Sequence, residues 1–183
     1  EGHADVASLL LTNGAAVNQA NENGATPLSI ACQEAHAEVA SLLLTNGAIV
    51  NQAKENGATP LSIACRKGHA DVASLLLTNG AAVNQANDNG ATPLYIACRE
   101  AHTEVASLLL TNGAVVNQAK ENGATPLLVA CEKGHADVAS LLLTNGAAVN
   151  QAKENGATPL YIACLKGHAD VASLLLTNGA AVN

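Results

Sequence analysis

The chain repeats itself every 33 residues from one end to the other, and this period restricts its possible folds more than any other feature. The triplet Thr-Pro-Leu returns at the same place in successive units, starting at Thr26, Thr59, Thr92, Thr125 and Thr158. Repeats of this length each form one small supersecondary element, and neighbouring repeats bury each other's apolar faces. The period therefore predicts an elongated stack instead of a globule around one central core.

The whole chain, residues 1–183, is predicted to form one domain. A partial unit is followed by four complete units and a final unit, which span residues 1–20, 21–53, 54–86, 87–119, 120–152 and 153–183. We expect no specialised capping unit at either end, so apolar faces should be exposed at both. Such ends can dock head to tail with a second copy, or they can be covered within a longer array.

The first complete unit contains signals for two short helices. Thr26 is a good N-cap, and Pro27 suits the first helical position, where its missing N–H costs nothing. This helix is expected to end about eight residues later, at Glu34. A second helix is predicted from about residue 36 to residue 46, with Gly47 as a left-handed stop.

Stacking has to stabilise these helices, because helices this short are marginal alone. Each second helix carries a Leu triplet, and burying one Leu contributes about 1.5–3 kcal/mol. We expect the triplets, which begin at Leu9, Leu42, Leu75, Leu108, Leu141 and Leu174, to dominate the interfaces between units. An Asn-Gly pair such as Asn56-Gly57 predicts a tight hairpin turn before the next Thr-Pro-Leu.

The composition argues against two classes of partner. The net charge of −7 argues against DNA or RNA, because nucleic-acid binding needs Lys and Arg to neutralise phosphates. No apolar run is long enough to span a bilayer, so we expect no membrane insertion. No secretion signal is recognisable at the start of the sequence, although its first residue is not Met.

Five cysteines recur at one position of the repeat, at Cys32, Cys65, Cys98, Cys131 and Cys164. Each stands four residues before a histidine, as in half of a zinc site, but the predicted helix ends between the two, so we expect no metal site. Equivalent positions in adjacent units should lie about 8–10 Å apart, beyond the reach of a disulfide. Free thiols indicate a reducing compartment such as the cytoplasm, and burial should make them slow to react.

No residue pattern predicts an enzyme or a cofactor site. A catalytic site needs one unique constellation, whereas each candidate here is copied five or six times. This applies to the histidines at the predicted starts of the second helices, His3, His36, His69, His102, His135 and His168. The glycines of the Asn-Gly-Ala motif are turn formers, because no Lys-Ser or Lys-Thr follows them to complete a phosphate-binding loop.

Taken together, the motifs resemble the ankyrin repeat. Asn-Gly-Ala-Thr-Pro-Leu, Ile-Ala-Cys, Gly-His, Val-Ala-Ser-Leu-Leu-Leu, Asn-Gly-Ala and Val-Asn follow one another along the whole chain. The resemblance implies an all-α solenoid of stacked antiparallel helix pairs joined by β-hairpin-like turns. It also implies a concave groove, made by the hairpin tips and the first helices, that usually binds another protein. In the family the Cys position is small and buried, and the second-helix His serves packing and local hydrogen bonds.

The sequence departs from the ankyrin pattern at two turns. The family usually has a His after Thr-Pro-Leu that braces the turn, and we expect its hydrogen bond to be lost here. The position holds Ser29, Ser62, Tyr95, Leu128 and Tyr161. The family's Gly before the second-helix His is present at Gly2, Gly68, Gly134 and Gly167 but becomes Ala35 and Ala101 in two units. If the backbone stays left-handed there, each Ala costs about 1 kcal/mol; otherwise the turn is rebuilt.

The units fall into two kinds. Units with Ala at this turn carry Glu, Glu and a branched apolar residue at three further positions, where units with Gly carry Lys, Asp and Ala. The co-variation is explained either by physical coupling or by duplication of a pair of units, and we favour duplication. The near-identity of the units is compatible with a recently expanded natural array and with an engineered one, although designers tend to remove thiols.

Variation within the array indicates a candidate contact surface. It concentrates at two first-helix positions that are four residues apart and share a helix face, as in the pair Tyr95 and Arg99. By resemblance, the second member of each pair faces the groove together with the acidic and Asn residues at the hairpin tips. The candidate residues are Glu55, Asn56, Arg66, Asp88, Asn89, Tyr95, Arg99, Glu121, Glu132, Tyr161 and Leu165. Tyr and Arg are common interface anchors, whereas drift on a solvent-facing helix is the alternative explanation.

The leading functional hypothesis is a non-catalytic scaffold that binds a protein partner through the concave groove. The competing hypothesis is a structural or engineered array that supplies length and stiffness and stacks end to end without a discrete partner. One saturable partner in a pull-down experiment would distinguish the first from the second.

Overall fold

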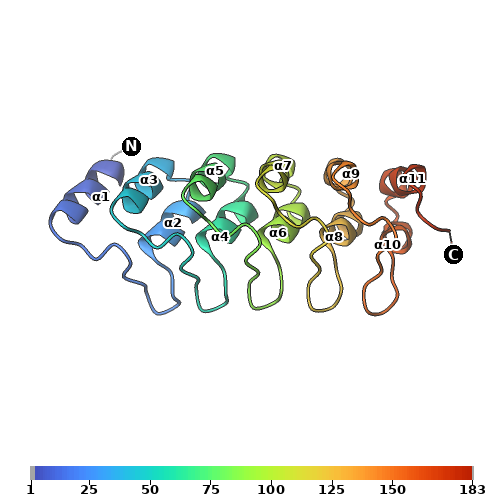
Figure 1. The fold of residues 1–183 in the computed structure, drawn as a ribbon, viewed down its shortest axis with the longest axis horizontal. Coiled ribbons are helices and arrows are strands. Elements are labelled where there is room, and N and C mark those ends of the chain that lie inside the picture. Colours follow the sequence, from blue (N-terminus) through green and yellow to red (C-terminus); the bar gives the residue numbers. More distant parts are fainter. Residues whose placement is uncertain (1–2, 183) are drawn as a thin grey trace.

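The computed structural model describes residues 3–182 and confirms the predicted all-α solenoid. The described range forms eleven helices and no β-strand: α1 (His3–Thr12), α2 (Pro27–Gln33), α3 (Ala37–Thr45), α4 (Pro60–Lys67), α5 (Ala70–Thr78), α6 (Pro93–Arg99), α7 (Thr103–Thr111), α8 (Pro126–Lys133), α9 (Ala136–Thr144), α10 (Pro159–Lys166) and α11 (Ala169–Thr177). Even-numbered helices are first helices of their units and odd-numbered helices are second helices. Figure 1 shows the two kinds in neighbouring rows, with the hairpin loops projecting on the side of the first helices.

Each first helix begins at a Thr-Pro pair, as predicted. The hydroxyl of Thr26 accepts a hydrogen bond from the backbone N–H of Ser29 at 3.2 Å, and the other four units repeat this cap. Ser29 Oγ also donates to the Thr26 carbonyl at 2.8 Å, and Ser62 Oγ donates to the Thr59 carbonyl at 2.9 Å. A side-chain hydrogen bond to this turn is therefore retained in two units, where we expected it to be lost.

The second helices end in a left-handed residue, as predicted. In α3 the stop is Gly47, at φ 87°. The N–H of Gly47 donates to the Leu44 carbonyl at 3.1 Å, and the N–H of Ala48 donates to the Leu43 carbonyl at 2.9 Å. This pair of bonds satisfies carbonyls that the end of a helix would otherwise leave free.

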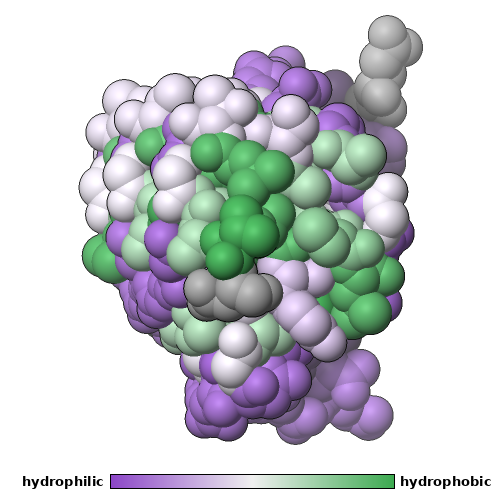
Figure 2. Space-filling model, turned by 90° about the vertical axis from the view of Figure 1, so that its right-hand side faces the viewer, coloured by the Kyte–Doolittle hydropathy of each residue, from purple (hydrophilic) through white to green (hydrophobic). Residues whose placement is uncertain are grey.

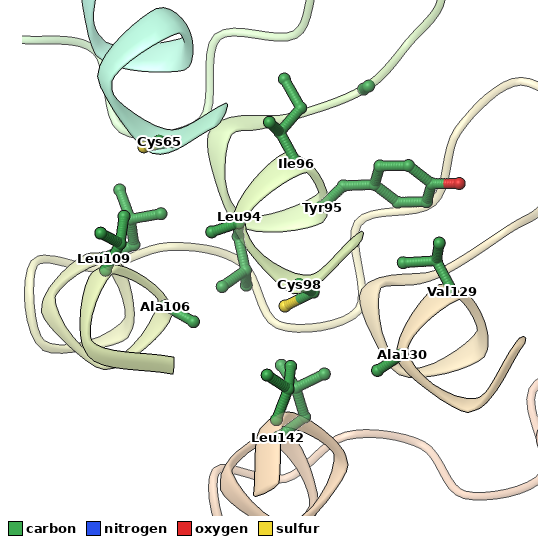
Figure 3. Close-up of a cluster of buried hydrophobic side chains, with 14 of the residues drawn as sticks. Cys65, Leu94, Tyr95, Ile96, Cys98, Ala106, Leu109, Val129, Ala130 and Leu142 are labelled. Atoms are coloured by element: carbon green, nitrogen blue, oxygen red, sulfur yellow. The ribbon is translucent and has the colours of Figure 1, made fainter. Parts of the chain in front are cut away.

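The core is a continuous apolar layer between the two rows of helices. Its main residues are the middle Leu of each complete triplet, Leu43, Leu76, Leu109, Leu142 and Leu175, all of which are buried. The first Leu of each triplet is only half-buried in the units after α1. Figure 3 shows Leu94 and Cys98 of α6 lying between Leu109 of α7 and Leu142 of α9. The triplets therefore stabilise the stack mainly through their middle residue.

A series of Asn side chains joins consecutive units, which the sequence interpretation missed. Asn18 Nδ2 donates to the Gly47 carbonyl at 3.0 Å, and Asn18 Oδ1 accepts from the N–H of Ile49 at 2.9 Å. The same two bonds recur at Asn51, Asn84, Asn117 and Asn150. Each Asn thus ties the loop of one unit to the end of the next unit's second helix. Its presence in every Val-Asn pair was the available signal.

The two alanines at the turn between helices keep the left-handed backbone. Ala35 lies at φ 59° and Ala101 at φ 62°, whereas Gly68 and Gly134 lie at φ 76°. Gly2, which holds the same position in the partial unit, lies outside the described residues. The turn is therefore not rebuilt, and the Cβ atoms of the two alanines impose strain.

Replacing Ala35 by Gly should stabilise the chain. The substitution relieves the left-handed strain but loosens the unfolded chain, so we expect the free energy of unfolding to rise by about 0.5–1 kcal/mol. Urea denaturation followed by circular dichroism measures this change. The matched control, Ala37→Gly in the first turn of α3, should lower the free energy of unfolding, because a right-handed helix position has no strain to relieve. A destabilised Ala35→Gly variant would contradict the interpretation.

The length of the helices also bears on the membrane prediction. The longest helix, α1, has ten residues, which is about half of what a bilayer span needs. Within residues 3–182 no helix combines the length and the hydropathy required to cross a membrane.

Candidate protein-binding surface

The hairpin tips form one exposed row along the solenoid. The acidic tip residues Glu55, Asp88 and Glu121 and the Asn residues that follow them are all exposed. Backbone hydrogen bonds join neighbouring tips, because the N–H of Asp88 donates to the Asn56 carbonyl at 3.3 Å and the N–H of Glu55 donates to the Asn23 carbonyl at 3.4 Å. The acidic side chains are thus presented once per unit from connected turns.

A second row lies near the C-terminal ends of the first helices, at Gln33, Arg66, Arg99, Glu132 and Leu165. All five side chains are exposed or partly exposed. Arg99 is held by its neighbour, since its Nη2 lies 2.7 Å from Glu100 Oε1 and its Nε donates to the same oxygen at 2.8 Å. Such a surface pair adds little stability, but it restricts where the guanidinium points.

Tyr95 does not offer a free ring to a partner, contrary to the prediction that made it a central anchor. The residue is only 7% exposed, and Figure 3 shows its side chain extending from α6 above Val129 of the next unit. Lys120 Nζ lies 5.4 Å from the ring centroid, a cation–π contact. Burial raises the pKa of the Tyr95 hydroxyl, Arg99 lowers it, and Glu132 raises it. The following unit covers this position, so the two variable positions do not form one exposed face.

The last unit reverses this burial. Tyr161 holds the same repeat position as Tyr95 and is 58% exposed, and Leu165 and Leu176 are exposed as well. Figure 2 looks onto this end of the solenoid and shows apolar side chains gathered on it. In the described structure no further unit covers these side chains. At the opposite end Val6, Leu9 and Leu10 of α1 are likewise exposed, which agrees with the predicted apolar ends.

The cysteines follow the same rule. Cys32, Cys65, Cys98 and Cys131 are free and buried, whereas Cys164 is free but exposed, so the prediction of burial was wrong for the last unit. Burial raises the thiol pKa of Cys32 and of Cys131 to about 12. The pKa values of Cys65 and Cys98 are raised further by the same cause. Four thiols are therefore held in their unreactive protonated form.

The histidines connect units, whereas the resemblance implied local hydrogen bonds. His69 Nε2 donates to the Gln33 carbonyl at 3.1 Å, and His102, His135 and His168 make the corresponding bonds to the carbonyls of Arg66, Arg99 and Glu132. His3 and His36 instead stack with their ring centroids 4.6 Å apart. Within residues 3–182 no group of three His, Cys, Asp or Glu side chains is placed to hold a metal ion.

Comparison with known proteins agrees with this architecture. The family model described as ankyrin repeats (3 copies) matches residues 1–54, 46–120 and 112–183, so the matches together span the sequence. No curated protein gives a significant match. The helix pairs and the family match lead to one conclusion: the chain belongs to the ankyrin repeat family.

Proposed function

We propose that this chain is a non-catalytic recognition scaffold that binds a protein partner through its concave side, made by the hairpin tips and the first helices. Ankyrin repeats generally mediate protein–protein interaction, and the family is typically non-catalytic. One observation carries the proposal for this chain. The units are nearly identical, yet they differ at an exposed position near the end of each first helix, where Gln, Arg, Arg, Glu and Leu follow one another.

The proposed contact set combines this position with the tips. Arg66, Arg99 and Glu132 supply the side chains that vary, and the exposed tip residues supply a regular acidic row: Glu55, Asp88 and Glu121, with Asn56 and Asn89 beside two of them. A partner would therefore meet central arginines beside a line of carboxylates, which favours a surface of mixed charge. Tyr95 is left out because its ring is buried. The free thiols favour a reducing compartment, and we include a cytoplasmic location in the proposal.

The double variant Arg66→Ala, Arg99→Ala tests the proposal. A protein that is retained by the immobilised chain is identified, purified and titrated against the chain by calorimetry. We expect the double variant to bind it at least about tenfold more weakly, because Arg residues in the centre of an interface commonly carry much of the binding energy.

The matched control carries the same change of net charge on the second helices. Ser74→Glu together with Ser107→Glu alters exposed positions of α5 and α7 and should leave the affinity unchanged. Equal affinity of the wild-type chain and the arginine variant for the purified partner would exclude this contact set. Failure to retain any saturable partner would favour a structural array.

A further inference from the structure

An apolar groove lies at the N-terminal end, between α1 and α2. Its volume is about 620 Å³, and its lining includes Val6 and Leu10 of α1, Ile30 of α2, Leu43 of α3 and the ring of His36. We call it the N-terminal groove. It occupies the place beside α1 where every later second helix has a first helix of its own unit.

The lining residues are exposed only because this one helix is missing from their surroundings. Ile30 is 44% exposed, whereas its counterpart Ile63, which has α2 before it, is 6% exposed. Leu10 is 56% exposed, whereas its counterpart Leu76, which has α4 as its first helix, is 0% exposed. First helices of consecutive units contact each other along the whole array. The groove therefore has the shape and chemistry that accept a first helix of this repeat.

His36 adds a polar requirement to the groove. In the four later units the corresponding His donates from Nε2 to a carbonyl near the end of the preceding first helix, 36 residues earlier. For His36 that carbonyl would belong to the last residue of the missing helix. The ring of His36 lines the groove and stacks on His3. A helix bound in the groove can thus be recognised by both an apolar face and a carbonyl oxygen.

We propose that the N-terminal groove binds a first-helix segment supplied in trans, a peptide with the pattern Thr-Pro-Leu-x-Ile-Ala-Cys-x whose final carbonyl accepts a hydrogen bond from His36. The apolar face of this peptide covers Leu10 and Ile30. Its turn residues lie beside the first hairpin tip, where Glu22 corresponds to Glu55, whose N–H bonds the preceding tip. This inference does not depend on the proposed concave binding surface.

The end of a second copy does not meet the same requirement. In the register of the array, the carbonyl of Leu165 corresponds to the carbonyls of Arg66 and Arg99, and its partner one unit further on corresponds to His3, not His36. A copy stacked head to tail would therefore cover the outer face of α1 and leave the N-terminal groove empty. Its own first helix, α10, is already packed, with Leu160 and Ile162 buried.

The probe is a fluorescent synthetic peptide with the sequence of residues 21–33 and an amidated C-terminus, titrated with the full chain under reducing conditions. Because so short a helix has to fold as it binds, we expect saturable binding with a Kd of about 10–500 µM. Leu10→Asp and Ile30→Asp should each weaken binding at least about tenfold, since each places a carboxylate in the apolar groove. His36→Ala should weaken it several-fold, and in the wild-type chain the ring nitrogens of His36 should shift in ¹⁵N NMR spectra on titration.

Two variants with equally exposed apolar residues serve as controls. Leu9→Asp alters the outer face of the same helix, and Leu165→Asp alters the opposite end of the array; both should leave peptide binding unchanged. A peptide carrying Leu28→Asp should not bind. The proposal is overturned if binding does not saturate below about 1 mM, if Leu165→Asp weakens it as much as Leu10→Asp does, or if the resonances of His36 stay unchanged at saturation. It is also overturned if sedimentation shows oligomers that Leu10→Asp abolishes and Leu9→Asp does not, because a second copy would then occupy the groove.

Discussion

At pH 8, the thiol of Cys164 should react with Ellman's reagent within seconds to minutes, while the other four thiols react at least about 1000-fold more slowly. Cys164 is exposed, whereas the other four cysteines are buried. The pKa of Cys32 rises from 9.0 to about 12, so its thiolate fraction at pH 8 falls about 1000-fold. Reagent access to the buried sulfurs slows these reactions further. Absorbance kinetics, with mass spectrometry of the labelled peptides, measure both the rate and the site.

The conservative variant Cys164→Ser provides the control for this experiment. It should remove the fast phase and leave the slow phase unchanged, and denaturant should make all remaining thiols react together. Rapid labelling of Cys98 in the native chain would contradict the described packing, because Cys98 lies in the middle of the array and is completely buried.

Leu109→Ala should lower the free energy of unfolding by about 3–4 kcal/mol. Leu109 is the middle Leu of its triplet and lies among Leu94, Cys98 and Leu142, so its truncation leaves a cavity that both adjacent units line. The same truncation at Leu9, which is exposed, should change the free energy by no more than about 0.5 kcal/mol. Urea denaturation of the two variants and the wild-type chain measures the difference.

Two outcomes would contradict this assignment of the core. A loss at Leu109 no larger than that at Leu9 would mean that the middle Leu positions do not carry the interfaces. An equally large loss at Leu108→Ala, which alters the half-buried first position of the same triplet, would mean that the triplet is buried as a whole.

The helices and their ends could be predicted because their signals are local. Thr26 and Pro27 specify a helix start from adjacent residues, and Gly47 specifies a stop by its own conformational freedom. The period then specified the stack, since units of this kind have to bury their faces against one another. For these reasons the all-α solenoid and nearly all helix bounds followed from the sequence.

The candidate site was less predictable because exposure depends on neighbours. Tyr95 and Tyr161 occupy the same repeat position, yet one is buried and the other exposed, which only the number of following units decides. Cys131 and Cys164 differ for the same reason. The inter-unit bonds of Asn84 and His102 were also missed, because they join residues 29 to 36 positions apart and require the relative placement of two units.

The Asn bonds between consecutive units have a mechanical consequence. Asn51, Asn84 and Asn117 each link one junction and no other, so a pulling force along the solenoid passes through these joints in series. The load is not divided among them, and the weakest joint therefore sets the tension at which the molecule begins to lengthen. Extension should then proceed by discrete steps of one repeat, like a chain of separate springs.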